Sequence, residues 1–497
     1  MSDNLIVCQG LVKSYGHKAA LTGIDLEVGR GRIVGLLGPN GSGKTTLIKL
    51  LCGLLRPTAG NLAVAGLPVG PETKALVSYL PDRMYFASWM RAVDLFDLFR
   101  DFYQDFDYDK ALAMCRSLGV EPKDRLKSMS KGTKEKVQLV LVMARKAQLY
   151  LLDEPIAGVD PAARDFILRT ILTNYNEEGT VLISTHLIAD IEKVLDEVIL
   201  LKDGALMLHE SVDHIREERG RPVPRDLSRH AHGRRRVLML GKLLKYDFRS
   251  MWKQFSVIWP AALILAFLNR FTMFGMDNPG GSAFGEWMGV ISMGLFGGVC
   301  FTMVILSAVF VLTRFYKGLL GDEGYLMHTL PVRSWQLVLS KLICALATTV
   351  VNGIVGILAM FLMMPLNWDE IFDTQLWQAV FRNLVQQTDI ILYFLEFLLL
   401  LLVMCAAMFM NFYLAMSIGH LFSRRRILMS VVAFFGLNIL DSVITSTLHN
   451  MDMMNWLYGM DLSDHAGYWL GILLLLIPTV IMFLLTSWIL KHKLNLE

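Results

Sequence analysis

A glycine-rich segment near the N-terminus holds the residues best suited to phosphate chemistry. It follows a predicted buried strand over residues 31–38, precedes a predicted helix from residue 47, and contains Gly38, Asn40, Gly41, Ser42, Gly43, Lys44, Thr45 and Thr46. Glycines allow backbone N–H groups to surround a phosphate at the helix N-terminus. Lys44 can then reach the β- and γ-phosphates, and the Thr45 hydroxyl can bind Mg²⁺. The spacing and context predict a P-loop for ATP and Mg²⁺ rather than a chance glycine-rich turn.

Two adjacent carboxylates end a second predicted buried strand, over residues 147–155. Asp153 fits a role in holding Mg²⁺, usually through water, and Glu154 fits polarisation of an attacking water. Paired acids at the end of a strand are often only solvated turn residues. The P-loop upstream favours the catalytic interpretation here.

Further short motifs follow in a fixed order. Residues 129–134 stand where ATP-binding cassette (ABC) transporter ATPases have a Leu-Ser-Gly-Gly-Gln signature, Asp160 matches their D-loop, and His186 matches their switch histidine. Tyr15 stands where that family stacks an aromatic ring on adenine. With the P-loop and the paired acids, these motifs make residues 4–215 resemble an ABC ATPase.

The resemblance implies a composite ATP site formed by two copies of the ATPase. Ser130 and Gly132 of one copy would face ATP held by the P-loop of the other, at the N-terminus of a predicted helix. His186 would contact the γ-phosphate, although a histidine after an apolar strand, taken alone, is more often a capping or core residue. The expected partner is therefore a second copy of the chain.

Two motifs depart from the family pattern. Lys131 and Thr133 replace the second small residue and the final glutamine of the signature, and Asp82 occupies the place of the Q-loop glutamine. An aspartate can accept hydrogen bonds from Mg²⁺-bound water but has no amide donor, so coupling is expected to be tuned differently. Residues 79–83, 131–136 and 153–165 resemble the bacterial Ytr-type subgroup, which implies a bacterial cell envelope.

Composition indicates a second, membrane-embedded domain. The 497 residues are 54% hydrophobic with a mean hydropathy of +0.45, and the long uncharged runs all lie beyond residue 240. Such runs of about 20 residues can cross a bilayer. The net charge of +3 does not favour a nucleic-acid partner. The six cysteines lack the spacing of a zinc site or a disulfide scaffold.

The C-terminal half is predicted to hold six spans. An Arg-rich linker over 216–237 precedes them; it could bind nucleic acid, but its position favours anionic lipid headgroups. An amphipathic stretch over 238–253 predicts an interfacial connecting helix. The spans are expected near 255–275, 287–313, 342–366, 390–418, 427–448 and 467–490.

Charge in the connecting loops predicts the orientation. Basic residues cluster after the second and fourth spans and in the C-terminal tail, whereas the other loops carry mainly acids. The positive-inside rule then places the ATPase and both termini in the cytoplasm. The loop over 321–341 resembles the cytoplasmic segment of ABC-2-type permeases, and in that family it would form a coupling helix on the ATPase.

Two acidic residues fall within or near predicted spans. Glu396 lies about two turns into the fourth span and Asp441 lies late in the fifth. Charge inside a bilayer is costly, so either residue could line a substrate path, or it could simply bond to a neighbouring helix. The sequence leaves both interpretations open and favours the structural one.

These observations predict an α/β P-loop ABC domain over 1–215, a linker over 216–237, a connecting helix over 238–253 and an all-α six-helix ABC-2-like domain over 254–497. The expected activity is ATP-driven export by a homodimer in a bacterial cell membrane, with an amphipathic peptide, lipid or drug-like cargo. A heterodimer with another half-transporter is not distinguished. The alternative is an ATP-driven mechanical or sensory complex that moves no cargo.

Overall fold

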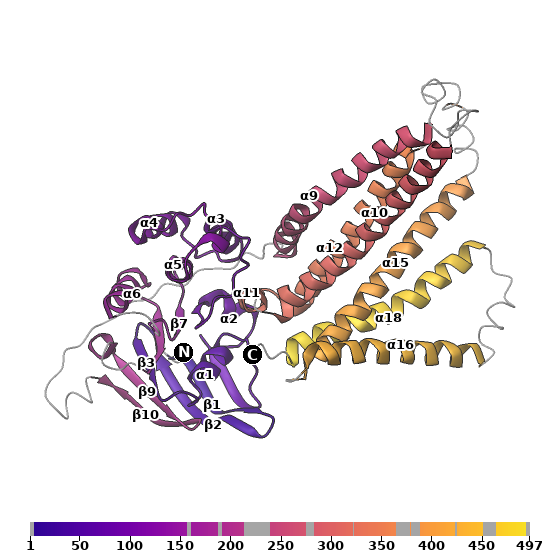
Figure 1. Cartoon of the computed structure of the whole chain (residues 1–497). Helices are drawn as coiled ribbons and strands as arrows, with labels where there is room; N and C mark the ends of the chain where they lie inside the picture. The colour runs from indigo at the N-terminus through magenta and orange to yellow at the C-terminus, as the bar shows by residue number, and fades with distance from the viewer. Residues whose placement is uncertain are drawn as a thin grey trace. The chain divides into compact units, whose positions relative to one another are not determined.

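The computed structural model describes residues 4–156, 161–186, 191–212, 239–274, 283–321, 323–363, 378, 388–422, 425–450 and 464–493. The chain divides into two compact units. Unit 1 comprises 1–242, 317–333 and 492–497, and unit 2 comprises 243–316 and 334–491. We call them the ATPase unit and the helical unit (Figure 1). The predicted linker over 216–237 lies outside the described residues.

The ATPase unit contains two sheets. The smaller is antiparallel, in the order β2-β1-β4-β5, with β1 Asn4–Tyr15, β2 Lys18–Gly29, β4 Ala59–Val64 and β5 Leu67–Pro68. Alternating buried and exposed residues along β2 show that one face of this sheet covers the core.

The larger sheet positions the candidate site. Its order is β10-β9-β3-β8-β7-β6, with β3 Ile33–Leu37, β6 Val77–Leu80, β7 Leu149–Asp153, β8 Thr180–Thr185, β9 Glu197–Lys202 and β10 Ala205–Ser211. All of these strands run parallel to their neighbours except the edge strand β10. The strands β6, β7 and β8 are buried along their whole length, as expected for parallel strands covered on both faces.

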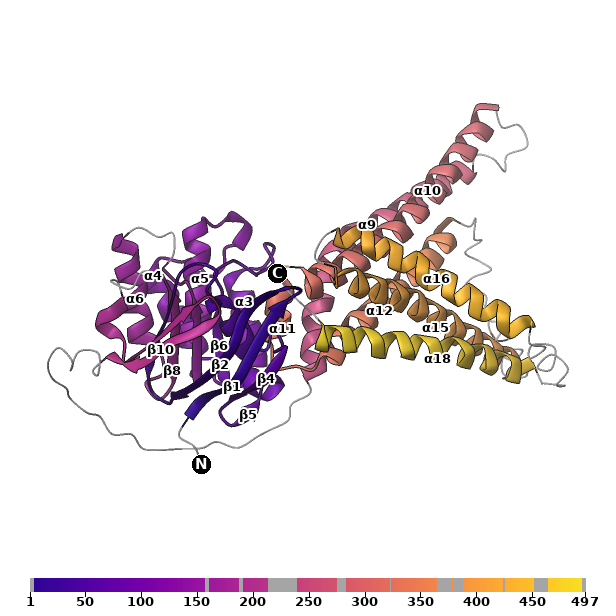
Figure 2. The ribbon, with the colours of Figure 1, turned by 90° about the horizontal axis from the view of Figure 1, so that it is seen from below.

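Helices complete the ATPase unit, as Figure 2 shows from below. They are α1 Lys44–Leu51, α2 Pro71–Leu76, α3 Ala92–Phe102, α4 Tyr108–Leu118, α5 Lys131–Met143 and α6 Pro161–Asn174, with 3₁₀ turns at Leu126–Ser128 and Glu192–Val194. The π-helical turn Tyr316–Leu320 and α11 Glu323–Thr329 fall mostly within Lys317–Arg333, which clusters with this unit although it lies between two long apolar helices in sequence.

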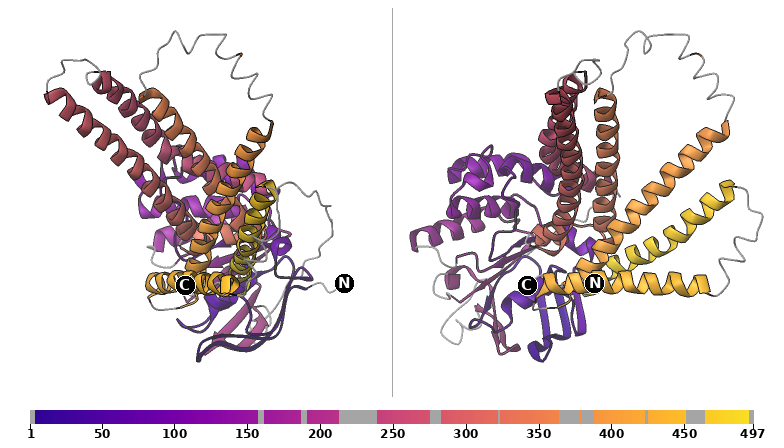
Figure 3. Two further views of the ribbon diagram at one scale, coloured as in Figure 1. Left: turned by 90° about the vertical axis from the view of Figure 1, so that its right-hand side faces the viewer. Right: turned by 45° about the vertical axis from the view of Figure 1, so that its right-hand side comes forward.

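The helical unit consists of long apolar helices. They are α9 Met239–Phe274, α10 Ala283–Phe315, α12 Ser334–Met363, α15 Thr388–Gly419, α16 Arg426–Asn450 and α18 Asp464–His492. Small buried clusters join α9, α10 and α12, one around Ala262, Met303 and Val355, the next around Ala266, Phe296 and Ala359. In Figure 3, the C-terminal end of α15 lies beside the N-terminal end of α16, and the two helices are in contact.

The fold class predicted from the sequence is confirmed. Within the described residues, six helices are long and apolar enough to cross a membrane, and they correspond to the six predicted spans. The structure adds one feature at the first span. Residues expected to form an interfacial helix and the first span lie in one continuous helix of 36 residues, α9. At 1.5 Å per residue it is about 54 Å long, longer than the hydrocarbon core of about 30 Å.

Candidate functional site

The P-loop turns sharply between β3 and α1. Gly38 has φ +147° and Gly43 has φ +105°, both in the region that favours glycine. A Cβ at Gly38 would lie 2.2 Å from the Leu201 carbonyl oxygen, and one at Gly43 would lie 2.6 Å from the Ala20 carbonyl oxygen. These positions therefore need glycine for backbone conformation and for space.

Lys44 is held inside this turn. Its ammonium donates to the carbonyls of Gly38 at 2.8 Å and Pro39 at 3.2 Å, and its side chain is 6% exposed. The Glu154 carboxylate lies 3.6 Å from the same nitrogen. The Lys44 ammonium is thus held beside the end of β7 by carbonyls of its own loop.

Asp153 is the buried centre of the site. One carboxylate oxygen, Oδ1, accepts from Thr45 Oγ1 at 3.1 Å and from Ser184 Oγ at 2.6 Å. The other, Oδ2, is buried and has no hydrogen-bond partner among the described residues. Burial raises the pKa of Asp153, and the nearby Asp82 carboxylate raises it further. A buried oxygen left open beside the Thr45 hydroxyl fits a Mg²⁺ site, because hard cations prefer oxygen ligands.

Glu154 follows in a strained backbone conformation. Its φ of +51° is uncommon for a residue with a Cβ, and its N–H donates to the Ser184 carbonyl at 3.2 Å and hydroxyl at 3.0 Å. Its Oε2 lies 3.0 Å from His186 Nδ1. The structure therefore brings Glu154, His186 and Lys44 together, as the sequence predicts for groups around a γ-phosphate.

The remaining predicted residues lie at several places. Asn40 and Gly41 are exposed on the P-loop, and Ser42 is buried, with no hydrogen-bond partner for its hydroxyl among the residues that the structure describes. Thr45 and Thr46 lie in the first turn of α1, which begins at Lys44. Asp82 is exposed after β6.

Ser130, Gly132 and Tyr15 belong to other elements of the ATPase unit. Ser130 caps α5, with its hydroxyl accepting from the Thr133 N–H at 3.1 Å, and Gly132 is exposed in the first turn. Tyr15 ends β1, where the Lys13 ammonium lies 5.3 Å from its ring centroid. Asp160 lies outside the described residues.

Sequence reasoning missed the role of Ser184. It is fully buried and bonds both to the Asp153 carboxylate and to the Glu154 backbone. The signal was present, because Ser184 lies near the end of a buried strand, two residues before His186. Only the pairing of β7 with β8, in which Asp153 lies opposite Ser184, reveals the contact.

Comparison with known proteins agrees with this geometry. The "ABC transporter" family model matches residues 21–157. The ATP-binding protein YtrB of Bacillus subtilis is 30% identical over 43% of this chain and 74% of its own length. The chain belongs to the ABC transporter family.

Other relatives share the same region. An ABC transporter ATP-binding protein of Synechocystis is 33% identical over 39% of this chain, which spans only 58% of that relative. The SkfA peptide export ATP-binding protein SkfE of Bacillus subtilis is 30% identical over 41% of this chain and 87% of its own length. A solved structure of an ABC transporter ATP-binding subunit is 27% identical over 44% of this chain and 93% of that chain, with a TM-score of 0.38.

The ABC ATPase unit also holds the segment between α10 and α12. Tyr325 of α11 lies between two cations: Lys49 of α1, 5.4 Å from its ring centroid, and Arg83, 4.7 Å away. Arg83 also donates to the Tyr325 hydroxyl. Arg83 directly follows Asp82 in the chain, and its carbonyl accepts from Gln138 of α5 at 3.3 Å. Tyr325 therefore contacts elements that continue from the P-loop and from the Asp82 position.

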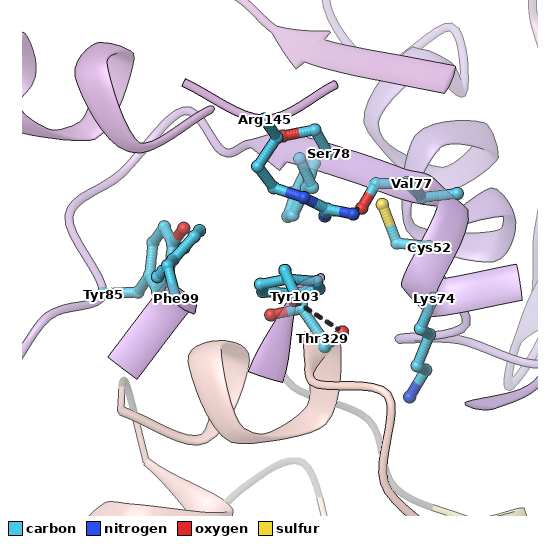
Figure 4. Close-up of a pocket in the computed structure, with 10 residues that line it drawn as sticks. Cys52, Lys74, Val77, Ser78, Tyr85, Phe99, Tyr103, Arg145 and Thr329 are labelled. Carbon is cyan, nitrogen blue, oxygen red and sulfur yellow. Dashed lines mark hydrogen bonds between the residues drawn. The ribbon is translucent and has the colours of Figure 1, made fainter. Parts of the chain in front are cut away.

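The last carbonyls of α11 are capped by the same unit. Tyr103 donates to the Thr329 carbonyl at 3.1 Å (Figure 4), and Lys74 donates to the His328 carbonyl. Cations and donors at a helix C-terminus satisfy carbonyls that have no partner within the helix. Burial lowers the pKa of Lys74 to about 8, and burial raises the pKa of Tyr103 to about 12.

A buried arginine packs against the Tyr103 ring. Arg145 is 1% exposed, forms a bidentate pair with Asp105 at 3.0 Å, and donates to the carbonyls of Ala75 and Val77. Its guanidinium lies 3.7 Å from the Tyr103 ring centroid. Arg145 therefore helps to hold Tyr103 in place at the C-terminal end of α11.

The two acidic residues of the spans behave differently. Glu396 is 3% exposed, and its Oε2 lies 2.9 Å from Nδ1 of His465 in α18. The His465 ring stacks on Tyr393 with centroids 4.1 Å apart. Asp441 is exposed on α16. The bond between α15 and α18 supports the structural interpretation of Glu396.

Proposed function

We propose that this chain is one half of an ATP-driven exporter that works as a homodimer in a bacterial cell membrane. The observation that carries the proposal is the buried Asp153 Oδ2, which has no partner among the described residues and belongs to the carboxylate that Thr45 binds. The described part of the chain also has six helices long and apolar enough to cross a membrane. A site left open for a ligand fits ATP and Mg²⁺. Six spans and the basic loops predict that the ATPase and both termini face the cytoplasm.

Each residue of the site has a defined task in this proposal. Lys44 and the P-loop N–H groups would bind the phosphates, while Thr45 and Asp153 would hold Mg²⁺, which would supply positive charge close to the phosphates. Glu154 accepts a hydrogen bond from the attacking water, and the contact of His186 with its carboxylate fixes the direction of that acceptor. Asp82 is near enough to influence Asp153 electrostatically and would contact Mg²⁺-bound water.

The homodimer rests on the position of α5. Ser130 and Gly132 are exposed at the N-terminus of a helix of 13 residues. Such a terminus attracts anions. In the proposed assembly, this terminus of one copy completes the ATP site of the other.

The cargo proposal rests on relatives. SkfE is named for export of the SkfA peptide, and another relative is a linearmycin resistance ATP-binding protein. We therefore propose an amphipathic peptide, lipid or drug-like cargo.

The test is to purify the full chain in lipid nanodiscs and to measure particle mass and ATPase rate. Replacing Glu154 with Gln should lower the rate by about 100-fold or more, because it removes a general base. Glu178→Gln is the matched control, since Glu178 is exposed in a turn before β8. A two-chain particle with this pattern supports the proposal, and an inactive single-chain particle contradicts the homodimer.

Cargo movement requires a second measurement. Inside-out vesicles should accumulate a labelled amphipathic peptide, lipid or drug only with ATP, and Glu154→Gln should abolish accumulation. Strong ATPase activity without accumulation of any probe would contradict export and favour the mechanical or sensory alternative.

A further inference from the structure

A cluster of charged and aromatic side chains closes one end of the helical unit. Asp247 of α9 is 2% exposed and is bound by three side chains from two other helices. Arg314 of α10 lies 3.4 Å from Oδ1, Lys341 of α12 donates to the same oxygen, and Ser340 of α12 donates to Oδ2 at 3.1 Å. Both carboxylate oxygens of Asp247 are therefore engaged.

A fourth helix, α15, contacts residues beside Asp247. Tyr413 of α15 is 1% exposed, and its ring stacks on Phe315, with centroids 4.0 Å apart and planes at 9°. Its hydroxyl donates to the Lys341 carbonyl at 3.5 Å. We call Asp247, Arg314, Phe315, Ser340, Lys341 and Tyr413 the Asp247 cluster.

Four residues of the Asp247 cluster lie on either side of residues 317–333 in the chain. Arg314 and Phe315 end α10, while Ser340 and Lys341 lie in the second turn of α12. Residues 317–333 between them belong to the ATPase unit, where Tyr325, His328 and Thr329 are bound. The two chain ends that leave the ATPase-bound segment 317–333 are thus joined to each other by Asp247 and by Tyr413.

A buried ion pair is a poor device for stability alone. Desolvation offsets much of its attraction, and apolar residues of similar volume often stabilise a fold as well or better. Its geometry is specific, however, because separating the partners would leave charges buried without compensation. The helices that share Asp247 are therefore strongly held against moving apart.

We propose that Asp247 is a positioning residue for coupling, which makes α9, α10 and α12 follow the ATPase-bound segment 317–333 as one body. This inference rests on the proposed ATP-driven function. Without the cluster, the two ends of the segment can separate, and its movement is absorbed locally instead of reaching the membrane helices.

The experiment follows movement in each unit separately. Spin labels replace Met207 on β10 or Ile357 on α12, both exposed, in a full-length background with the six native cysteines substituted. In nanodiscs, distances between the two copies are measured by pulsed electron paramagnetic resonance, with and without ATP, in the Glu154→Gln chain. In this parent we expect ATP to change both distances.

Asp247→Asn should separate the two responses. The Met207 label should respond to ATP as in the parent, while the shift at the Ile357 label should fall about fivefold or more, the scale of ordinary coupling between sites. Asp247→Glu, which keeps the charge, should restore part of the shift. Asp389→Asn is the matched control, because this exposed carboxylate lies in the first turn of α15.

Each other outcome has a definite meaning. If both labels respond normally in Asp247→Asn, or both fail while the parent responds, Asp247 has no specific role in transmission and the inference is overturned. If neither label responds in the parent, the proposed ATP-driven function itself fails. Thermal unfolding of every variant identifies loss through misfolding.

Discussion

The candidate ATP site and the Asp247 cluster are both built around a buried aspartate, but the two carboxylates differ in how many of their oxygens are hydrogen-bonded. Asp153 has one carboxylate oxygen bonded to Thr45 and Ser184 and the other without a partner among the described residues. Asp247 has both oxygens occupied by protein side chains. A site that binds a ligand can leave a buried polar atom without a protein partner, at a cost in folding free energy. A site that only holds helices together satisfies every buried polar atom with protein partners.

The largest predicted effect is the loss of ATPase activity when Asp153 is replaced. Asp153→Asn should lower the ATPase rate by about a thousandfold, because a carboxylate that holds Mg²⁺ contributes several kcal/mol to catalysis. The fold should remain, since Asn can still accept from Thr45 and Ser184. Steady-state ATPase rates and thermal unfolding of the same samples check the prediction. A large loss of thermal stability would mean that the Asp153 carboxylate is primarily structural.

Asp247→Asn should show the opposite pattern. It leaves the Arg314 and Lys341 charges buried without their anion, so the free energy of unfolding should fall by about 3 kcal/mol. The ATPase rate of the folded fraction should stay close to wild type. Thermal denaturation in nanodiscs measures the first quantity, and Asp247→Asn with Lys341→Met should recover part of the stability. An additive, worse double variant would show that the two residues are not paired.

A smaller effect concerns Lys74, whose pKa is about 8 against an ordinary value of 10.5. Between these values the unfolded state binds more protons than the folded state, so stability rises with pH. Wild type should gain about 1 kcal/mol per pH unit relative to Lys74→Met between pH 8.5 and 10. Thermal melts at both pH values test this. Equal pH dependence of the two proteins would mean that Lys74 titrates normally.

The smallest predicted effect concerns the ring of Tyr325. Tyr325→Leu removes the contacts with Lys49 and Arg83 and should cost about 1 kcal/mol in the stability of the ATPase unit. Tyr325→Phe keeps the ring and should lose less than half as much. Parallel denaturant titrations compare the two. Equal losses would assign the contact to the hydroxyl that Arg83 binds.

The sequence by itself predicted most of the candidate ATP site, because the residues proposed for it lie close together in the chain. Gly38, Gly43, Lys44 and Thr45 belong to one turn, and Asp153 and Glu154 are adjacent, so spacing alone indicated their roles. The six spans could also be predicted from the sequence, since a helix that crosses a bilayer requires about 20 apolar residues in a row.

Only the tertiary structure revealed Ser184 beside Asp153, the cations around Tyr325, and the partners of Asp247. Arg314 and Lys341 lie 67 and 94 residues from Asp247 in the chain. No periodicity or local motif encodes such a pairing. A charge near the end of a span is typical of an interfacial residue, and its burial against another helix depends on how the helices pack. Local spacing therefore predicted the candidate ATP site, while the packing of distant segments decided how the ends of the ATPase-bound segment 317–333 are joined.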